Sequence, residues 1–402
     1  MRTQVGIVGA GPAGLLLSHL LALQGIESVV LENRSREYVE ARIRAGVLEH
    51  DTVDVLIETG VGDRMQREGL VHEGLELRVD GHGTRIPLTE LTGRRIMVYG
   101  QQEVVKDLIA HRLADGGTVL FEAEATSISG IDSDEAVIRF TQDGEEHELA
   151  CDVVAGCDGF HGISRAAMPD HAYRERVHDY PFGWLGITAE VPPSTDELIY
   201  TWHERGFALH SLRSPELSRL YVQCDPGDDI EQWPDEAIWA ELQTRMARAG
   251  WTLKQGPIVE KAITPMRGFV TEPMQHGRLY LAGDAAHIVP PTGAKGLNLA
   301  VADVRVLADG LAAWYADGRT DLLDRYSETA LKRVWKVQHF STWMTHMLHT
   351  FPNDPDGFFR RVQRAQLDYV TGSRAAATSL AEFYVGLPTI IRSDEEPSLR
   401  EL

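Results

Sequence analysis

The sequence has few cysteines, no long hydrophobic run and a shortage of positive charge. Its three cysteines, Cys151, Cys157 and Cys224, form no CxxC pair and cannot build a disulfide framework, which favours a reducing compartment. No stretch reaches the roughly 18 uninterrupted apolar residues of a membrane-spanning helix, and the short, glycine-rich N-terminal run is unlike a signal peptide. We therefore expect a cytoplasmic protein without a membrane partner.

The charge balance excludes further function classes. The 402 residues include 39 Lys and Arg against 60 Asp and Glu, which gives a formal net charge of −21. Such a field repels phosphate backbones and anionic membranes at long range, so nucleic acid is not an expected partner. Any anionic ligand must be bound by local Arg or Lys. The hydrophobic fraction of 43% and the charged fraction of 25% are ordinary for a globular chain, and the length predicts two or three domains.

The first residues predict a βαβ unit. An apolar strand over 5–8 precedes the pattern Gly9-x-Gly11-x-x-Gly14, a helix over 12–24 and a strand over 28–31. Gly9 permits a tight turn, Gly11 lets backbone approach a pyrophosphate, and Gly14 lets the helix pack on the sheet. The helix N-terminus offers N–H groups to phosphates, and Glu32 after the second strand can accept from ribose hydroxyls. The unit predicts dinucleotide binding.

The order of the remaining elements predicts a discontinuous domain. Residues 53–68 are predicted to be helical, and residues 180–267 are rich in aromatic and strand-forming residues. A late buried strand over 279–282 then precedes a mostly helical stretch from Leu297 onward. We therefore predict an α/β fold in which a Rossmann-like nucleotide domain is interrupted by a β-rich domain and followed by helices.

Two later motifs also follow predicted strands. Asp158-Gly159 comes after a strand that ends near Ala155, and Gly283-Asp284 ends another. The second carboxylate is suited to a second ribose, and the helix that starts near Gly296 can point its N-terminus at a flavin carbonyl. All three motifs, in this order, resemble those of the flavoprotein aromatic hydroxylases, where they surround FAD.

The resemblance covers nearly the whole chain, from Thr3 to about Pro388, and is strongest to the members that hydroxylate 4-hydroxybenzoate. It implies an α/β fold with a discontinuous Rossmann-like FAD-binding domain, an inserted β-rich substrate domain and a helical C-terminal region. The implied ranges are 1–179 and 268–345 for the FAD-binding domain, 180–267 for the substrate domain and 346–394 for the C-terminal region. The segments that carry the resemblance are 42–49, 69–74, 180–186, 206–209, 287–298 and 384–388.

The resemblance implies an enzyme that uses FAD, a nicotinamide co-substrate (NADPH, NADH or both) and O2. In such enzymes NAD(P)H reduces the flavin, and a flavin C4a-hydroperoxide transfers oxygen to the carbon beside the phenol. The expected product from 4-hydroxybenzoate is 3,4-dihydroxybenzoate. The partners are then a small aromatic acid and O2, and the family is usually homodimeric through its later helices. No metal is expected, and His346-x-x-His349 has no supporting ligand.

The implied substrate residues lie at two ends of the ligand. Ser211 and Arg213 share one side of a strand, where Arg213 can bind a carboxylate in bidentate fashion, with Tyr221 as a further donor. At the phenol end the resemblance implies Tyr200, Tyr384 as a proton relay, His72 as the link to solvent and the carbonyl of Pro291. A hydrogen bond to the phenolate favours its ionisation. The implied catalytic set is therefore Tyr200, Tyr384, His72 and Pro291, and Tyr200 and Pro291 also belong to the substrate-binding set with Ser211, Arg213 and Tyr221.

The cofactor residues follow from the same segments. Arg219 corresponds to a side chain that contacts the flavin as it swings between two positions, and Lys295 supplies positive potential. The implied FAD-binding set is Gly9, Gly11, Gly14, Glu32, Arg42, Arg44, Gln101, Asp158, Asp284, Lys295, Gly296, Leu297, Asn298 and Arg219.

The nicotinamide site is less determined. His161 and Arg267 correspond to residues implicated in NAD(P)H binding, and Arg34 and Tyr38 lie in the stretch that discriminates between the coenzymes. NADPH-using members carry an Arg at the position of Asn33, so mixed use or a preference for NADH is favoured here. Two alternatives stay open: an FAD hydroxylase for another phenolic acid, and a non-catalytic FAD protein that binds an aromatic acid. A flavin halogenase is disfavoured, because the chain has no W-x-W segment.

Overall fold

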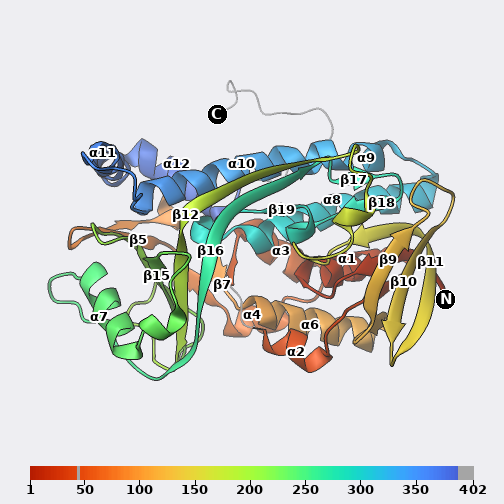
Figure 1. Ribbon diagram of the computed structural model, residues 1–402, viewed down its shortest axis with the longest axis horizontal. Helices are drawn as coiled ribbons and strands as arrows, with labels where there is room; N and C mark the ends of the chain where they lie inside the picture. Colours follow the sequence, from red (N-terminus) through yellow and green to blue (C-terminus); the bar gives the residue numbers. More distant parts are fainter. Residues whose placement is uncertain (43–45, 388–402) are drawn as a thin grey trace.

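The computed structural model describes residues 1–42 and 46–387 (Figure 1). It contains a mixed, mainly parallel sheet near the N-terminus, a second large sheet at the other end of the molecule, and long helices that lie along both. The predicted α/β architecture with a β-rich second part and C-terminal helices is confirmed. No helix of the described ranges is long and apolar enough to cross a membrane.

The first sheet holds the motifs. Its central strands are parallel, in the order β18-β11-β1-β2-β8, and an antiparallel meander of β9 and β10 extends from β11. Val8 pairs with both Leu31 and Gly156, and Gly156 pairs with Leu281, so four strands end at the same edge. The strands are β1 Arg2–Val8, β2 Ser28–Leu31, β8 Thr118–Leu120, β9 Glu124–Ser129, β10 Ala136–Gln142, β11 Glu145–Gly156, β17 Gln275–His276 and β18 Leu279–Leu281.

Helices cover this sheet, and its central strands are therefore buried. α1 packs against α6 and α8, and its leucines lie in one apolar core with the strands. A separate antiparallel sheet has three strands in the order β3-β7-β4. The elements of this part are α1 Pro12–Leu23, α2 Arg36–Ala41, β3 Val47–Leu48, α3 His50–Glu58, α4 Asp63–Glu68, β4 Leu70–His72, β7 Ile96–Val98 and α6 Gln101–Ala114.

The second sheet has the order β19-β16-β12-β15-β14-β13-β5-β6. Its two longest strands, β12 and β16, pair with each other and cross the middle of the molecule diagonally (Figure 1). One face packs against α7 around Leu220 and Trp239, and the other packs against α10 and α12 around Tyr200. The elements are β5 Leu75–Val79, β6 His82–Ile86, α5 Leu88–Thr92, β12 Arg174–Ala189, β13 Leu198–Trp202, β14 Ala208–Leu212, β15 Ser218–Cys224, α7 Asp235–Arg245, β16 Ile258–Glu272 and β19 His287–Ile288.

The C-terminal part is helical, as predicted. α8 starts at the edge where the first sheet's strands end, and α10 and α12 then cover the inner face of the second sheet. Three-residue helical turns are η1 Arg165–Ala167, η2 Ile230–Gln232, η3 Gly283–Ala285 and η4 Pro291–Gly293. The helices are α8 Gly296–Asp317, α9 Asp321–Asp324, α10 Tyr326–Leu348, α11 Phe358–Gly372 and α12 Arg374–Val385.

One predicted element is wrong. Residues 53–68 form two helices, α3 and α4, because Gly60 adopts a φ of +81° and ends the first one. The domain boundaries stay a prediction. β12 and β16 run through the positions 180 and 267, and β5 and β6, assigned to the FAD-binding part, pair into the second sheet. Positions 388–394 of the C-terminal region lie outside the described residues.

Candidate active site

The glycine motif forms a close-packed turn with one open position. Gly9 adopts a φ of +102°, and a Cβ there would lie 2.4 Å from the carbonyl oxygen of Cys157. A Cβ on Gly14 would lie 2.0 Å from the carbonyl oxygen of Gly9. A Cβ on Gly11, at the start of α1, would meet no atom within 4 Å. The turn is therefore closed against the protein and open toward solvent at Gly11, as a pyrophosphate requires.

Two carboxylates flank this turn. Glu32 accepts hydrogen bonds of 2.9 Å from the backbone N–H groups of Ala10 and Arg34, so it lies directly beside the glycine loop. Asp158 accepts from the backbone N–H and the hydroxyl of Ser164 through Oδ2, whereas its buried Oδ1 has no hydrogen-bond partner. Burial raises the pKa of Asp158. An orphaned acceptor at the edge of a parallel sheet fits a ligand that carries hydroxyl or N–H groups.

A buried pair shapes the loop that carries Asp284. Gly283 adopts a φ of +63°, and its N–H donates to Asp303 Oδ2 at 2.9 Å. The same oxygen lies 2.6 Å from His287 Nε2. Burial opposes the charged imidazolium, but the Asp303 carboxylate outweighs it and raises the pKa of His287. The pair thus fixes the turn that presents exposed Asp284 at the sheet edge.

The start of α8 is fixed by buried polar contacts. Asn298 donates to the carbonyls of Val47 and Ala294 and accepts from the Glu49 N–H at 2.9 Å. Lys295 is 2% exposed and donates to Glu49 Oε1 at 2.6 Å. Burial lowers the pKa of Lys295, although the Glu49 carboxylate opposes that shift. The four predicted residues Lys295, Gly296, Leu297 and Asn298 therefore open the helix together.

The predicted carboxylate-binding residues meet on the inner face of the second sheet. Arg213 Nη1 donates to Ser211 Oγ at 2.9 Å and to the Leu212 carbonyl at 2.8 Å. Arg213 Nε is buried without a hydrogen-bond partner, and burial lowers the pKa of Arg213. Within residues 1–42 and 46–387 no carboxylate forms an ion pair with it. Arg213 is partly buried, and a guanidinium withdrawn from water without a counter-ion is stabilised when an anion binds it.

The two predicted tyrosines also meet. The hydroxyls of Tyr200 on β13 and Tyr384 on α12 share a hydrogen bond of 2.7 Å, and both residues are 1% exposed. Burial raises the pKa of both phenols. Tyr200 pairs with Leu209, which pairs with Tyr221, so Tyr200 and Tyr221 share a sheet face with Ser211 two residues along β14.

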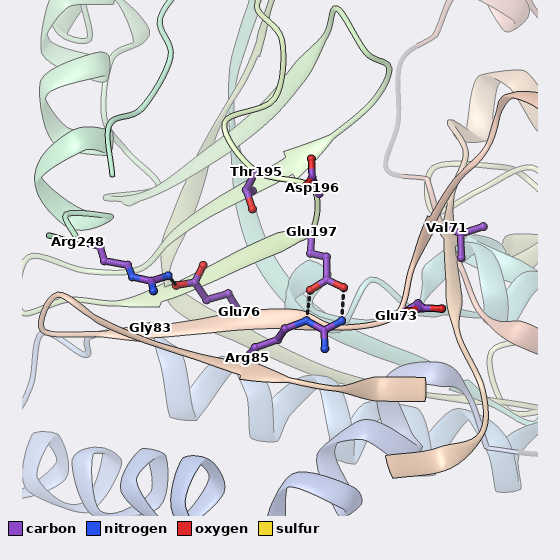
Figure 2. Close-up of a pocket in the computed structure, with 9 residues that line it drawn as sticks. All are labelled: Val71, Glu73, Glu76, Gly83, Arg85, Thr195, Asp196, Glu197 and Arg248. Atoms are coloured by element: carbon purple, nitrogen blue, oxygen red, sulfur yellow. Dashed lines mark hydrogen bonds and ion pairs between the residues drawn. The ribbon is translucent and has the colours of Figure 1, made fainter. Parts of the chain in front are cut away.

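His72 lies beside a charged cavity. It is 1% exposed, neither ring nitrogen has a hydrogen-bond partner, and burial lowers its pKa to about 4. Its neighbours Val71 and Glu73 line a cavity of about 760 Å³ (Figure 2). Figure 2 shows Glu197 in a two-point contact with Arg85, with both N···O distances 2.7 Å. The acidic groups that lie near enough to affect the His72 pKa are Glu197 and Asp196.

The remaining predicted residues have mixed placements. The carbonyl of Pro291 accepts from the Ala294 N–H at 2.9 Å, and Gln101 starts α6. Arg219 is tied to Thr188 and to Glu260 and lies over the Tyr221 ring. Arg42 is exposed, whereas Arg44 lies outside the described residues.

The predicted nicotinamide residues form two separate pairs. His161 and Arg267 both contact the ring of Phe160, at 4.9 Å and 5.2 Å. Arg34 lies over the ring of Tyr38 at 5.3 Å. No interaction of the described residues joins one pair to the other.

Sequence reasoning missed several residues of this site. Phe160 lies between the two motif residues Asp158 and His161, and an aromatic at that point was a usable signal. Glu49 lies in the segment 42–49 that carries the resemblance, but the sequence indicated no role for its side chain. Arg333, which donates to Glu49 Oε2 at 2.7 Å, is on α10 and carries no local signal, because only the fold brings it to the site.

The chain is similar to known proteins over almost its whole length. The family model described as FAD binding domain matches residues 2–341. The chain is 48% identical over 395 residues to p-hydroxybenzoate hydroxylase of Acinetobacter baylyi, which covers 98% of this chain and 97% of that protein. It is 27% identical to a 3-amino-4-hydroxybenzoate 2-monooxygenase of Streptomyces platensis, over 90% of this chain and 91% of that one.

A solved structure shows the same fold. The p-nitrophenol 4-monooxygenase of Pseudomonas putida matches with a TM-score of 0.83 at 20% identity, over 96% of this chain and 99% of that chain. The resemblance seen in the sequence is thus confirmed at full length. The chain belongs to the FAD-binding family of flavin-dependent aromatic hydroxylases, and it is an FAD-dependent monooxygenase with NAD(P)H as co-substrate.

Proposed function

We propose that the chain hydroxylates 4-hydroxybenzoate at the carbon beside the phenol, to give 3,4-dihydroxybenzoate. The observation that carries this proposal is a sheet face with a partly buried Arg213, whose Nε has no hydrogen-bond partner, at one end and the Tyr200–Tyr384 pair at the other. The full-length relative at 48% identity is a p-hydroxybenzoate hydroxylase, which supports the same substrate.

The spacing of the two ends suits a small ring. Tyr200 and Ser211 lie on adjacent strands and are offset by two residues along them. With strands about 4.8 Å apart and a rise of about 3.4 Å per residue, their Cα atoms are separated by roughly 8 Å. A benzene ring with a carboxylate and a hydroxyl at opposite positions fits between side chains that extend from such points.

The carboxylate end would bind through charge. Arg213 has an unused Nε donor, and Ser211 Oγ lies 2.9 Å from its Nη1, so both can turn to one anion. A guanidinium and a carboxylate form paired, charge-assisted hydrogen bonds, which orient the ring as well as hold it. The bound anion would also compensate the buried charge.

The phenol end would activate the ring. A phenolate is a richer electron donor than a phenol, and a hydrogen bond from Tyr200 to the phenolate favours ionisation. Because the pKa of Tyr200 and of Tyr384 is raised by burial, both stay protonated and serve as donors that pass a proton along. Tyr384 would receive the proton through its 2.7 Å contact with Tyr200.

His72 would complete the route to solvent. Its ring has no protein partner, and the flanking residues Val71 and Glu73 open onto the charged cavity of Figure 2. With a pKa lowered to about 4, it stays neutral near pH 7 and carries a proton only transiently. We therefore assign His72 the role of passing the proton on to solvent and not of holding it.

FAD fits the edge of the first sheet. The open Gly11 position, the orphaned Asp158 Oδ1 and Glu32 beside the glycine loop would hold its pyrophosphate and ribose, with Asp284 on the second side. The start of α8 and Lys295 would supply positive potential to the ring. Bound FAD supplies the electron transfer and oxygen chemistry, whereas the chain binds, orients and excludes water.

Two finer properties belong to the same proposal. His161 and Arg267 around Phe160 would bind NAD(P)H, and Asn33 favours NADH or mixed use. A cytoplasmic location and a homodimer are also proposed. The homodimer is proposed because α11 exposes several large apolar side chains that a second copy would cover. They are Phe358, Phe359, Val362 and Tyr369.

A substrate panel tests the proposal. Purified FAD-loaded enzyme is mixed with 4-hydroxybenzoate, 3-hydroxybenzoate, 3-amino-4-hydroxybenzoate and phenol, and NAD(P)H oxidation and hydroxylated product are followed together. We expect 4-hydroxybenzoate to give the highest kcat/KM with matching product. A better response to another phenolic acid would reassign the substrate, and binding without any stimulation would favour a non-catalytic role.

A further inference from the structure

We propose that Arg333 is a positioning residue for the phenol-activating tyrosines. Arg333, on α10, donates hydrogen bonds to the backbone carbonyl of Leu387, just after α12, and to the carboxylate of Glu49. These bonds fix the end of α12 and thereby the position at which the Tyr384 hydroxyl meets that of Tyr200. This inference rests on the proposed function of the tyrosine pair.

The end of α12 has little support of its own. The last carbonyls of a helix have no partner within it, and Gly386, at a φ of +99°, takes the chain away after Val385. Three basic side chains from other elements supply donors instead. Lys295 donates to the Tyr384 carbonyl at 2.8 Å, Arg94 to that of Gly386 at 3.2 Å, and Arg333 to that of Leu387 at 2.6 Å.

Glu49 links two of these donors. Its Oε1 accepts from Lys295 at 2.6 Å and its Oε2 from Arg333 at 2.7 Å, while the residue itself is only 1% exposed. A Cβ on Gly386 would lie 2.4 Å from Glu49 Oε2, so the carboxylate packs directly against the turn. Glu49 and Arg333 therefore form a brace that contacts the segment 384–387 on its backbone.

Arg333 has a geometry that a lysine cannot copy. One terminal nitrogen, Nη1, serves the Leu387 carbonyl, and the other, Nη2, serves Glu49. The planar guanidinium sets the angle between these two bonds, whereas an ammonium offers a single charged point. Loss of Arg333 removes one of the three donors that hold the turn and leaves Glu49 Oε2 without this partner in a buried place, so the turn can shift.

The consequence falls on the tyrosine pair. Tyr384 is two residues before Gly386, and its hydroxyl must stay within 2.7 Å of Tyr200 for the proton to pass. When the turn shifts, that contact lengthens, the phenolate loses a polarised donor chain, and the ionisation of the bound phenol becomes harder.

The test is the apparent pKa of 4-hydroxybenzoate bound to the FAD-loaded enzyme, read from the ultraviolet absorbance of its phenolate. In Arg333→Met we expect a rise of about one pH unit, which is a tenfold lower phenolate fraction below the pKa. We expect kcat to fall at low pH and to recover as pH rises, and Arg333→Lys to show a smaller rise. Lys332→Met is the matched control, because this neighbour on α10 is exposed and pairs only with Glu328 among the described residues.

Each outcome decides. A lower Tm with an unchanged phenol pKa in Arg333→Met would mean a merely structural role and would overturn the proposal. If that variant does not fold, Arg333→Lys gives the same readout, and an unchanged pKa overturns the proposal again. If the wild-type enzyme does not respond to 4-hydroxybenzoate, the proposed function fails. In that case a crystal structure of Arg333→Met tests the positioning role of Arg333. Tyr200 and Tyr384 hydroxyls that still lie within hydrogen-bond distance would refute that role.

Discussion

Replacement of Arg213 by methionine should separate ligand binding from folding. Methionine keeps much of the side-chain volume but removes the charge and the donors. In the ligand-free protein the guanidinium is partly buried without an ion-pair partner among the described residues, so its removal should not lower stability and should raise Tm slightly. Binding of the carboxylate should suffer instead.

The magnitude follows from the bonds that are lost. A hydrogen bond to a charged group contributes about 1.5–3 kcal/mol, and a bidentate guanidinium–carboxylate contact contains two. Allowing for incomplete additivity, we expect a loss of about 3–4 kcal/mol, which raises Kd for 4-hydroxybenzoate by about 100- to 1,000-fold. The uncharged 4-hydroxybenzamide should lose far less.

Calorimetric titration of the FAD-loaded enzyme with both ligands measures these quantities, and thermal unfolding without ligand measures the stability. Arg205→Met is a suitable control, because Arg205 is an exposed partner of Glu241 and should leave Kd unchanged. The reasoning is refuted if Arg213→Met binds 4-hydroxybenzoate within twofold of wild type, or if both ligands weaken equally.

Three further predictions concern other parts of the site. Gly11→Ala should leave the Tm of the FAD-free protein unchanged but weaken FAD binding about tenfold. Gly14→Ala should lower that Tm, because its Cβ would lie 2.0 Å from the carbonyl oxygen of Gly9. Titration of the FAD-free protein with FAD measures the affinity, and thermal unfolding measures the Tm. Tyr384→Phe leaves the Tyr200 hydroxyl buried without its partner and should lower kcat about tenfold at low pH, as steady-state pH profiles would reveal. Burial lowers the pKa of His210 to about 4. The unfolded chain then binds more protons between pH 4 and 6.5, so stability should fall as pH drops through this window, by up to about 3 kcal/mol at pH 4, and His210→Gln should flatten that slope in denaturant unfolding.

Opposite results would be informative. Equal loss of FAD affinity and of Tm in Gly11→Ala would mean that the open position is structural. A Tyr384→Phe enzyme with the wild-type pH profile would remove Tyr384 from the proton route. An equal slope of stability with pH in the wild-type chain and in His210→Gln would show that His210 does not supply this pH dependence.

The edge of the first sheet was predictable because its signals are local. Gly9, Gly14 and Glu32 lie next to strand ends, and parallel strands that end in register bring such motifs together. The Tyr200–Tyr384 contact was different. It was expected from the resemblance alone, since the two residues are 184 positions apart and neither has a distinctive neighbourhood.

Long-range electrostatic contacts were beyond the reach of the sequence. Arg333 and Glu49 lie 284 positions apart, and only the packing of the folded chain brings α10 beside the start of α3, which no periodicity records. The predicted helix over 53–68 failed for a local reason, because the left-handed conformation of Gly60 outweighed helical composition on both sides. β13 lies in the stretch 180–267 that was predicted to be rich in strands, but its parallel pairing with β5 was not predicted, since pairing between distant segments leaves no turn signal.

The central claim is that this chain couples oxidation of NAD(P)H to hydroxylation of 4-hydroxybenzoate. The most direct measurement follows NADH and NADPH consumption by the purified yellow enzyme in air, with and without 4-hydroxybenzoate, and quantifies 3,4-dihydroxybenzoate in the same samples. The account predicts strong stimulation by the ligand, one product per NAD(P)H, and NADH at least as effective as NADPH. No stimulation with either coenzyme, or stimulation that yields hydrogen peroxide without product, would contradict it.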